Sequence, residues 1–66
     1  MAKIWTPQPI EVYRSWVDAI AREASDDLND WETKFVDDMD TRLTQLTNLT
    51  EGQADKLEQI YVKYTS

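Results

Sequence analysis

The side chains of this sequence that could do chemistry are carboxylates, and most of them lie in one short segment. Residues 26–40 hold seven acidic side chains against a single basic one, Lys34. The flanking segments, 1–25 and 41–66, each balance three acidic with three basic residues, so the net charge of −6 lies in residues 26–40. The seven acidic residues are Asp26, Asp27, Asp30, Glu32, Asp37, Asp38 and Asp40.

Acid–base catalysis by these carboxylates is not expected. Such chemistry needs a cleft that shifts the pKa of a carboxyl group, and Asp37 and Asp38 are neighbours that point about 100° apart on a helix. The chain has no His and no Cys, and "DDLNDWE" lacks the Asx spacing and the Gly of an EF-hand loop. We therefore predict that the protein is not an enzyme and has no catalytic residue, cofactor or metal ligand; a divalent-ion site is the weaker alternative.

Two interpretations of the acidic segment remain open. It can be a solvated surface that keeps a small aromatic-rich protein in solution, or a docking surface for a basic partner, where it would speed encounter and select partners. For the docking surface we predict partner-binding roles for Asp30, Asp37, Asp38 and Asp40, together with Trp5. Trp5 and Ile4 precede the first helix, where they either fold back onto one end of the protein or form an arm that completes an interface.

These side chains must be positioned by helices, because one Gly and two Pro in 66 residues argue against a β-rich fold. Apolar residues at spacings of three and four predict helices over residues 8–25, 30–46 and 51–64. The expected buried stripe of the second helix contains Trp31, Phe35, Met39, Leu43 and Leu46, with Val36 at its edge. The first stripe contains Ile10, Tyr13, Trp16, Val17, Ile20 and Ala24, and the third Ala54, Leu57, Ile60, Tyr61 and Tyr64.

Capping signals support these boundaries. Asn29 with Glu32, and Thr50 with Gln53, have the three-residue spacing of a capping box. Asn48 is a candidate left-handed residue after the second helix.

Size limits the fold to one small domain, residues 1–66, with residues 1–7 as an N-terminal arm. The expected fold is all-α, a compact three-helix bundle. The alternative is a helix hairpin that dimerises through the first helix, since association adds core to a short chain.

Two segments resemble a pattern in small, mostly uncharacterised helical proteins of bacteriophages and their hosts. That pattern reads Leu-Ser/Thr-x-Trp-Glu-x-x-Phe and then Leu-Ser/Thr-x-x-Gln-x-x-x-Leu-x-x-Ile-Tyr. The residues that match are Leu28, Trp31, Glu32 and Phe35, then Leu49, Thr50, Gln53, Leu57, Ile60 and Tyr61, while Asn29 replaces the hydroxyl residue. The resemblance implies a phage or mobile-element origin and no particular activity.

The function expected from these observations is non-catalytic protein–protein interaction. We predict an accessory protein that binds a basic surface of a nucleic-acid-handling protein. One alternative is a DNA mimic that inhibits a host nuclease or defence enzyme, and another is a purely structural module that self-associates as a homodimer. Direct binding of nucleic acid is not expected at a net charge of −6. No membrane span or signal segment is predicted, so we expect a cytoplasmic location, in the host cytoplasm if phage-encoded.

Overall fold

The apolar periodicity of the chain produces three helices in the predicted order. The computed structural model describes residues 4–65, in which the helices are α1 (Ile10–Ala24), α2 (Asp30–Thr44) and α3 (Glu51–Thr65). Each helix contacts the other two, and the most extensive contact joins α1 and α3. The protein is therefore a three-helix bundle, and the predicted all-α class is confirmed.

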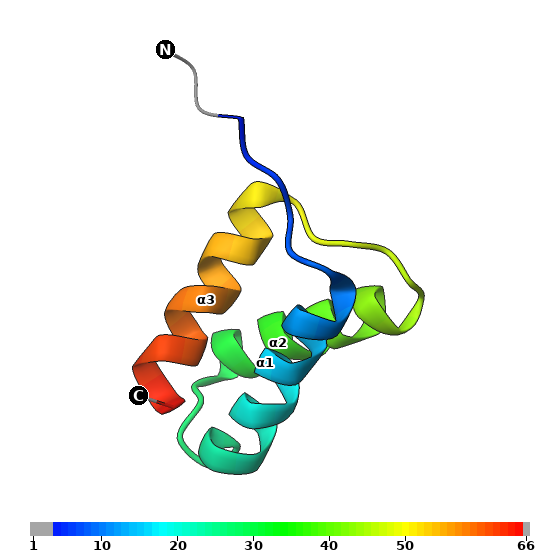
Figure 1. The fold of residues 1–66 in the computed structure, drawn as a ribbon. Coiled ribbons are helices and arrows are strands. Elements are labelled where there is room, and N and C mark those ends of the chain that lie inside the picture. Colours follow the sequence, from blue (N-terminus) through cyan, green and yellow to red (C-terminus); the bar gives the residue numbers. More distant parts are fainter. Residues whose placement is uncertain (1–3, 66) are drawn as a thin grey trace.

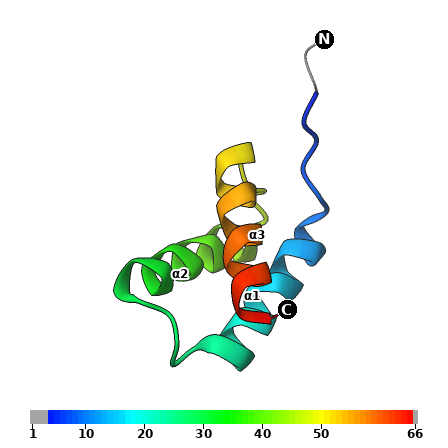
Figure 2. The same ribbon diagram turned by 90° about the vertical axis from the view of Figure 1, so that its left-hand side faces the viewer.

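The helices do not all lie parallel or antiparallel. In Figure 1, α1 and α3 lie side by side and run in the same general direction. Figure 2 shows that α2 crosses α3 steeply, so these two helices approach one another over a short part of their lengths. The segment before α1 is not helical and passes the beginning of α3.

The core is formed by one face of each helix and by Leu49 in the α2–α3 link. Tyr13, Ile20, Leu43 and Leu57 are fully buried. The remaining members of the core cluster are Val17, Val36, Met39, Leu49, Ala54 and Ile60. The stripes predicted for α1 and α3 are confirmed, because their members are either buried or packed against this cluster. Since α1 buries its stripe within the same chain, the bundle needs no second copy to cover this helix, and the hairpin alternative does not describe the fold.

The predicted register of α2 is partly wrong. Trp31 is 56% exposed and Leu46 is 76% exposed, whereas Glu32 is only 6% exposed. The buried face contains Glu32, Val36, Met39 and Leu43, with Phe35 half-buried at its edge. A strict four-residue spacing advances about 40° around a helix at each step, so a stripe that begins at Trp31 drifts away from the face centred on Met39 and Leu43.

The ends of the helices also differ in detail from expectation. Helix α1 begins at Ile10, because Pro9 is its N-cap with φ −56° and ψ 147°. Helix α2 ends at Thr44, and the left-handed residue after it is Leu46, with φ 59°, rather than Asn48. The N–H of Leu46 donates to the carbonyl of Leu43, and that of Thr47 to the carbonyl of Arg42, which is the Schellman pattern.

Both predicted capping boxes are present. The N–H of Glu32 donates to Oδ1 of Asn29 at 2.7 Å, and the N–H of Asn29 donates to Oε1 of Glu32 at 3.1 Å. At α3, the N–H of Thr50 donates to Gln53 Oε1 at 3.0 Å, and the N–H of Gln53 donates to Thr50 Oγ1 at 3.3 Å. The repeated pattern in the sequence thus marks two helix starts.

The link between the N-terminal arm and α1 is held by two hydrogen bonds of Gln8. The N–H of Gln8 donates to the hydroxyl of Tyr13 at 3.0 Å, and Asn48 Nδ2 donates to the carbonyl of Gln8 at 3.0 Å. Trp5 is 37% exposed and lies near the start of α3, but Ile4 is 90% exposed. Of the two alternatives for this segment, folding back onto the protein describes Trp5 but not Ile4. Residues 1–3 lie outside the described part of the chain.

Candidate functional site

The four aspartates predicted to bind a partner are all exposed on α2, but they do not form a single surface. Asp30 and Asp37 lie on nearly the same side of the helix, since seven residues are almost two full turns. Asp38 and Asp40 lie on opposite flanks, because two residues turn the helix by about 200°. The structure places Asp37 and Asp40 beside α1 and leaves Asp30 and Asp38 outside that contact.

A groove of about 460 Å³ runs between α1 and α2, and Asp37 and Asp40 belong to its wall. We call it the α1–α2 groove. Its floor is apolar, because Val17 and Val36 are buried there, Leu28 is half-buried and Ala21 adds a methyl group. Three exposed acidic residues, Asp18, Asp37 and Asp40, and one basic residue, Arg14, supply its charge, and Ser25 and Thr33 complete the lining.

The charges of the α1–α2 groove are unequally paired. Asp18 forms an ion pair with Arg22, which lies one turn further along α1, and 2.9 Å separates Asp18 Oδ2 from Arg22 Nη2. Within residues 4–65, neither Asp37 nor Asp40 forms an ion pair. The side of the groove formed by α2 therefore keeps two carboxylates without an ion-pair partner beside an apolar floor, and Arg14 on α1 is the one basic residue of the lining.

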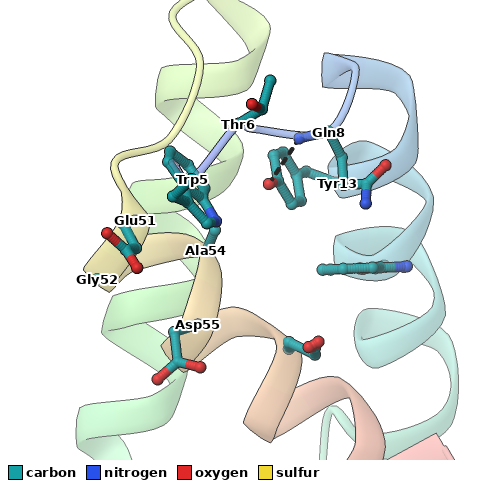
Figure 3. A pocket seen from close by; sticks show the side chains of 10 residues that line it. Trp5, Thr6, Gln8, Tyr13, Glu51, Gly52, Ala54 and Asp55 are labelled. Carbon is teal, nitrogen blue, oxygen red and sulfur yellow. Dashed lines mark hydrogen bonds between the residues drawn. The ribbon is translucent and has the colours of Figure 1, made fainter. Parts of the chain in front are cut away.

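Trp5, the fifth predicted partner-binding residue, belongs to a different cavity. This cavity, of about 560 Å³, lies between the N-terminal arm, α1 and α3, and we call it the arm pocket. Figure 3 shows Trp5 and Tyr13 beside it, with Glu51 and Asp55 projecting from α3. The structure thus separates Trp5 from the aspartates of α2 and brings it to acidic residues of α3.

Sequence reasoning missed the acidic lining of the arm pocket. Glu51, Asp55 and Glu58 all line it from α3. Their spacing of four and three residues places them on one helix face, which is a signal that the sequence contains. The net charge of residues 41–66 is zero. A net charge of zero does not reveal that the acidic and basic residues lie on different faces of the helix.

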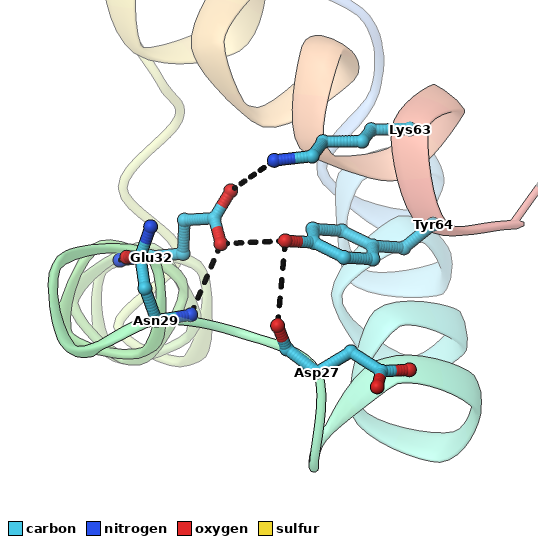
Figure 4. Close-up of polar contacts among 5 residues, drawn as sticks. All are labelled: Asp27, Asn29, Glu32, Lys63 and Tyr64. Carbon is cyan, nitrogen blue, oxygen red and sulfur yellow. Dashed lines mark hydrogen bonds and ion pairs between the residues drawn. The ribbon is translucent and has the colours of Figure 1, made fainter.

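A buried carboxylate joins the beginning of α2 to the last turn of α3. Glu32 Oε1 accepts a hydrogen bond from the Tyr64 hydroxyl at 2.7 Å, and Oε2 accepts one from Lys63 Nζ at 3.3 Å (Figure 4). The Tyr64 hydroxyl also lies 3.4 Å from the carbonyl oxygen of Asp27. Together with the Asn29 N–H, these contacts satisfy both oxygens of the one charged side chain that is buried within residues 4–65.

These contacts shift the protonation equilibria of the two charged partners in opposite directions. The Tyr64 hydroxyl, the Asn29 N–H and Lys63 lower the pKa of Glu32 against the opposing effect of desolvation. Tyr64 and Glu32 raise the pKa of Lys63. Since each partner is favoured in its charged form, the arrangement stabilises an ion pair. It leaves no group poised to exchange a proton, and we regard it as a structural clasp between α2 and α3.

An aromatic pair on α2 consists of the exposed Trp31 and the half-buried Phe35. Trp31 stacks on Phe35 with ring centroids 5.4 Å apart, and Lys56 Nζ lies 5.5 Å from the Trp31 ring centroid. Trp31 therefore contacts α3 through a cation rather than through the core.

Two further properties concern cation binding and membranes. Within residues 4–65 the structure gathers no group of three acidic side chains that could hold a metal ion. In the same part of the chain, none of the helices has the length and apolar character needed to cross a bilayer.

Comparison of the chain with protein-family models, curated proteins and solved structures found no match. The resemblance to small phage-type proteins, the absence of catalysis and the cytoplasmic location therefore stay predictions.

Proposed function

We propose that the protein is a protein-binding module that takes a basic, amphipathic segment of a partner in the α1–α2 groove. The observation that supports this most directly is the combination of an apolar floor with unpaired aspartates in one concave surface. A segment with apolar residues on one side and Lys or Arg beside them would cover Val17, Leu28 and Val36. Its cations would then lie near Asp37 and Asp40.

Charge and apolar contact play different parts in this proposal. Exposed carboxylates contribute little net binding energy, but they accelerate encounter and disfavour acidic partners. Apolar area removed from water supplies most of the affinity. A basic surface without an apolar side chain, or an apolar segment without cations, should therefore bind less well than a segment with both.

The experiment uses a labelled amphipathic helical peptide built of Lys and Leu, and fluorescence anisotropy to measure its Kd. The paired changes Asp37→Asn and Asp40→Asn should weaken binding by about tenfold and reduce its salt dependence. The matched control is Asp30→Asn with Asp38→Asn, which removes the same charge from the same helix outside the groove. Equal weakening by both pairs would show that only the general negative field acts, and would contradict the proposal.

A second variant blocks the groove, by volume and by charge, without replacing any acidic residue. Ala21 is exposed and lines the groove. Ala21→Arg keeps a good helix former on α1 while it fills the groove with a long cation. We expect peptide binding to be lost. The midpoint of urea unfolding should change no more than it does for other substitutions at exposed positions. Unchanged peptide binding would place the contact elsewhere.

A DNA mimic is the second proposal, supported by the acidic residues that α1, α2 and α3 each present to solvent. Asp18 faces the groove from α1, opposite Asp37 and Asp40 on α2. The apolar floor has no counterpart in a phosphate backbone, so we rank this proposal second. It requires that the protein and duplex DNA compete for the same nuclease, and simultaneous binding of both to that nuclease would exclude it.

A further inference from the structure

The arm pocket has aromatic side chains from two segments. Trp5 comes from the arm, and Tyr13 and Trp16 come from α1 one turn apart. Tyr13 meets Trp16 edge to face at 5.2 Å, and Trp16 stacks on Tyr61 with centroids 5.3 Å apart. The Gln8 N–H donates to the Tyr13 hydroxyl, so the arm and the ring are joined. The α1 rings are therefore fixed by packing before any ligand arrives, which lowers the entropy lost on binding.

Acidic residues of α3 supply the charge of the arm pocket. Glu51, Asp55 and Glu58 are exposed, and no Lys or Arg is among the residues that line the cavity. Within residues 4–65 none of the three forms an ion pair, although Gln59 Nε2 donates to Asp55 at 3.0 Å. Like charges one turn apart repel one another, and a cation in the pocket would relieve that repulsion.

We propose that the arm pocket binds an organic cation, either a guanidinium group or an alkylated ammonium group. The faces of Trp rings attract such cations through the ring quadrupole. Trp5 and Trp16 are the accessible rings, since Tyr13 is buried behind them, and nearby carboxylates provide counter-charge. The cavity is large enough for a group of this size with part of the chain that bears it. Such a cation can be an arginine side chain of a protein or a free quaternary ammonium compound, and the experiment separates the two.

The arm pocket shares no lining residue with the α1–α2 groove. The two proposals can therefore fail separately. Asp37→Asn with Asp40→Asn should leave cation binding in the arm pocket unchanged, and loss of peptide binding in the groove would say nothing about the pocket.

The experiment follows the three tryptophan indole N–H signals by NMR during titration. The probes are N-acetyl-arginine amide and choline, and the neutral controls are N-acetyl-citrulline amide and 3,3-dimethylbutanol. We expect saturable shifts of the Trp5 and Trp16 signals with the cations and none with the neutral compounds. Trp31 is an internal control, because it lies against Lys56 and does not line the pocket.

Variants connect the shifts to the proposed contacts. Asp55→Asn with Glu58→Gln should weaken cation binding by about tenfold. Trp5→Ala should weaken it similarly, because it removes a ring that lines the pocket. This variant should still fold, since Trp5 lies outside the core cluster. The control pair is Asp30→Asn with Asp38→Asn. Circular dichroism melts verify that every variant folds.

Each outcome decides the proposal. Saturable shifts with arginine amide alone support the proposal, with a protein side chain as the source of the cation. Saturable shifts with choline alone support it, with a free ammonium compound as the ligand. Saturable shifts with both support a pocket that recognises either kind of organic cation. Equal shifts by the neutral compounds, equal shifts at Trp31, or binding that is unaffected by Asp55→Asn with Glu58→Gln and by Trp5→Ala would overturn it.

Discussion

Trp31 and Glu32 are neighbours at the start of α2 with opposite environments, since Trp31 is exposed and Glu32 is buried. Glu32 was identified as a capping residue, and its side chain does cap the helix, yet it also fills a buried position that an apolar residue would ordinarily occupy. Its partners Lys63 and Tyr64 lie 31 and 32 residues away. No local pattern could associate them, because the contact depends on how α3 crosses α2. Trp31 is the converse case, since its size suggested the core although the register of the helix turns it outward.

Replacing Trp31 tests this register. Trp31→Ala should lower the free energy of unfolding by about 1 kcal/mol, because the lost contacts are one stacking partner and one cation. Leu57→Ala, at a fully buried position, should cost about 2–5 kcal/mol. Urea unfolding of both variants makes the comparison, and a larger cost for Trp31→Ala than for Leu57→Ala would contradict the observed register.

Leu46 offers a second test at one residue. Its φ of 59° lies in the left-handed region, which costs a residue with a Cβ atom about 1–2 kcal/mol. The side chain is exposed, so little packing is lost on substitution. Leu46→Gly should therefore raise the free energy of unfolding by about 0.5 kcal/mol, after allowing for the greater freedom of Gly in the unfolded chain. Leu46→Ala keeps the strain and should give no such gain.

At the scale of the helices, boundaries were predictable and packing partners were not. The two capping boxes and the stripes of α1 and α3 carry their signals within a few neighbouring residues. The end of α2 was placed two residues late, because Leu46 is an unusual choice for a left-handed C-terminal position. The steep crossing of α2 and α3 depends on distant contacts such as that of Tyr64 with Glu32.

The clasp gives a prediction about how two helices are joined. Tyr64→Phe removes the hydroxyl that donates to Glu32 and should lower the free energy of unfolding by about 1.5 kcal/mol, since hydrogen bonds to charged groups are among the stronger ones. Tyr61→Phe is the matched control, because no hydrogen bond from the Tyr61 hydroxyl is present within residues 4–65 and its ring stack is kept. Chemical denaturation measures both. Similar losses would mean that the clasp contributes nothing specific.

At the scale of the whole molecule, the charge imbalance was predictable but its arrangement was not. The sequence locates the excess acid in residues 26–40, and the aspartates predicted there are exposed. Whether an aspartate of α2 lies in the α1–α2 groove, as Asp37 and Asp40 do, or outside it, as Asp30 and Asp38 do, depends on where α1 packs. The acidic residues of α3 form part of a cavity only because Trp5 of the N-terminal arm lies beside them.

The stability of the bundle should depend on pH through Glu32. Because the folded pKa of Glu32 lies below its unfolded value, the unfolded state binds more protons between the two values, and stability falls as pH falls. The contribution is fully present above about pH 5 and is lost as the pH drops through the folded pKa. The difference in unfolding free energy between the wild type and Glu32→Gln should therefore shrink from pH 7 to pH 3. Glu23→Gln, at an exposed site, is the matched control for the removal of one carboxylate.

Both ends of the described chain are engaged, since Trp5 lines the arm pocket and Tyr64 completes the clasp. A dye or a surface linker attached at Trp5 or at Tyr64 would disturb one of them. Gln45 is exposed directly after α2, and neither it nor its neighbours in the chain line either cavity. Because the chain has no native cysteine, Gln45→Cys would supply a unique thiol for maleimide coupling, and sensor chips prepared in this way would leave both concave surfaces accessible.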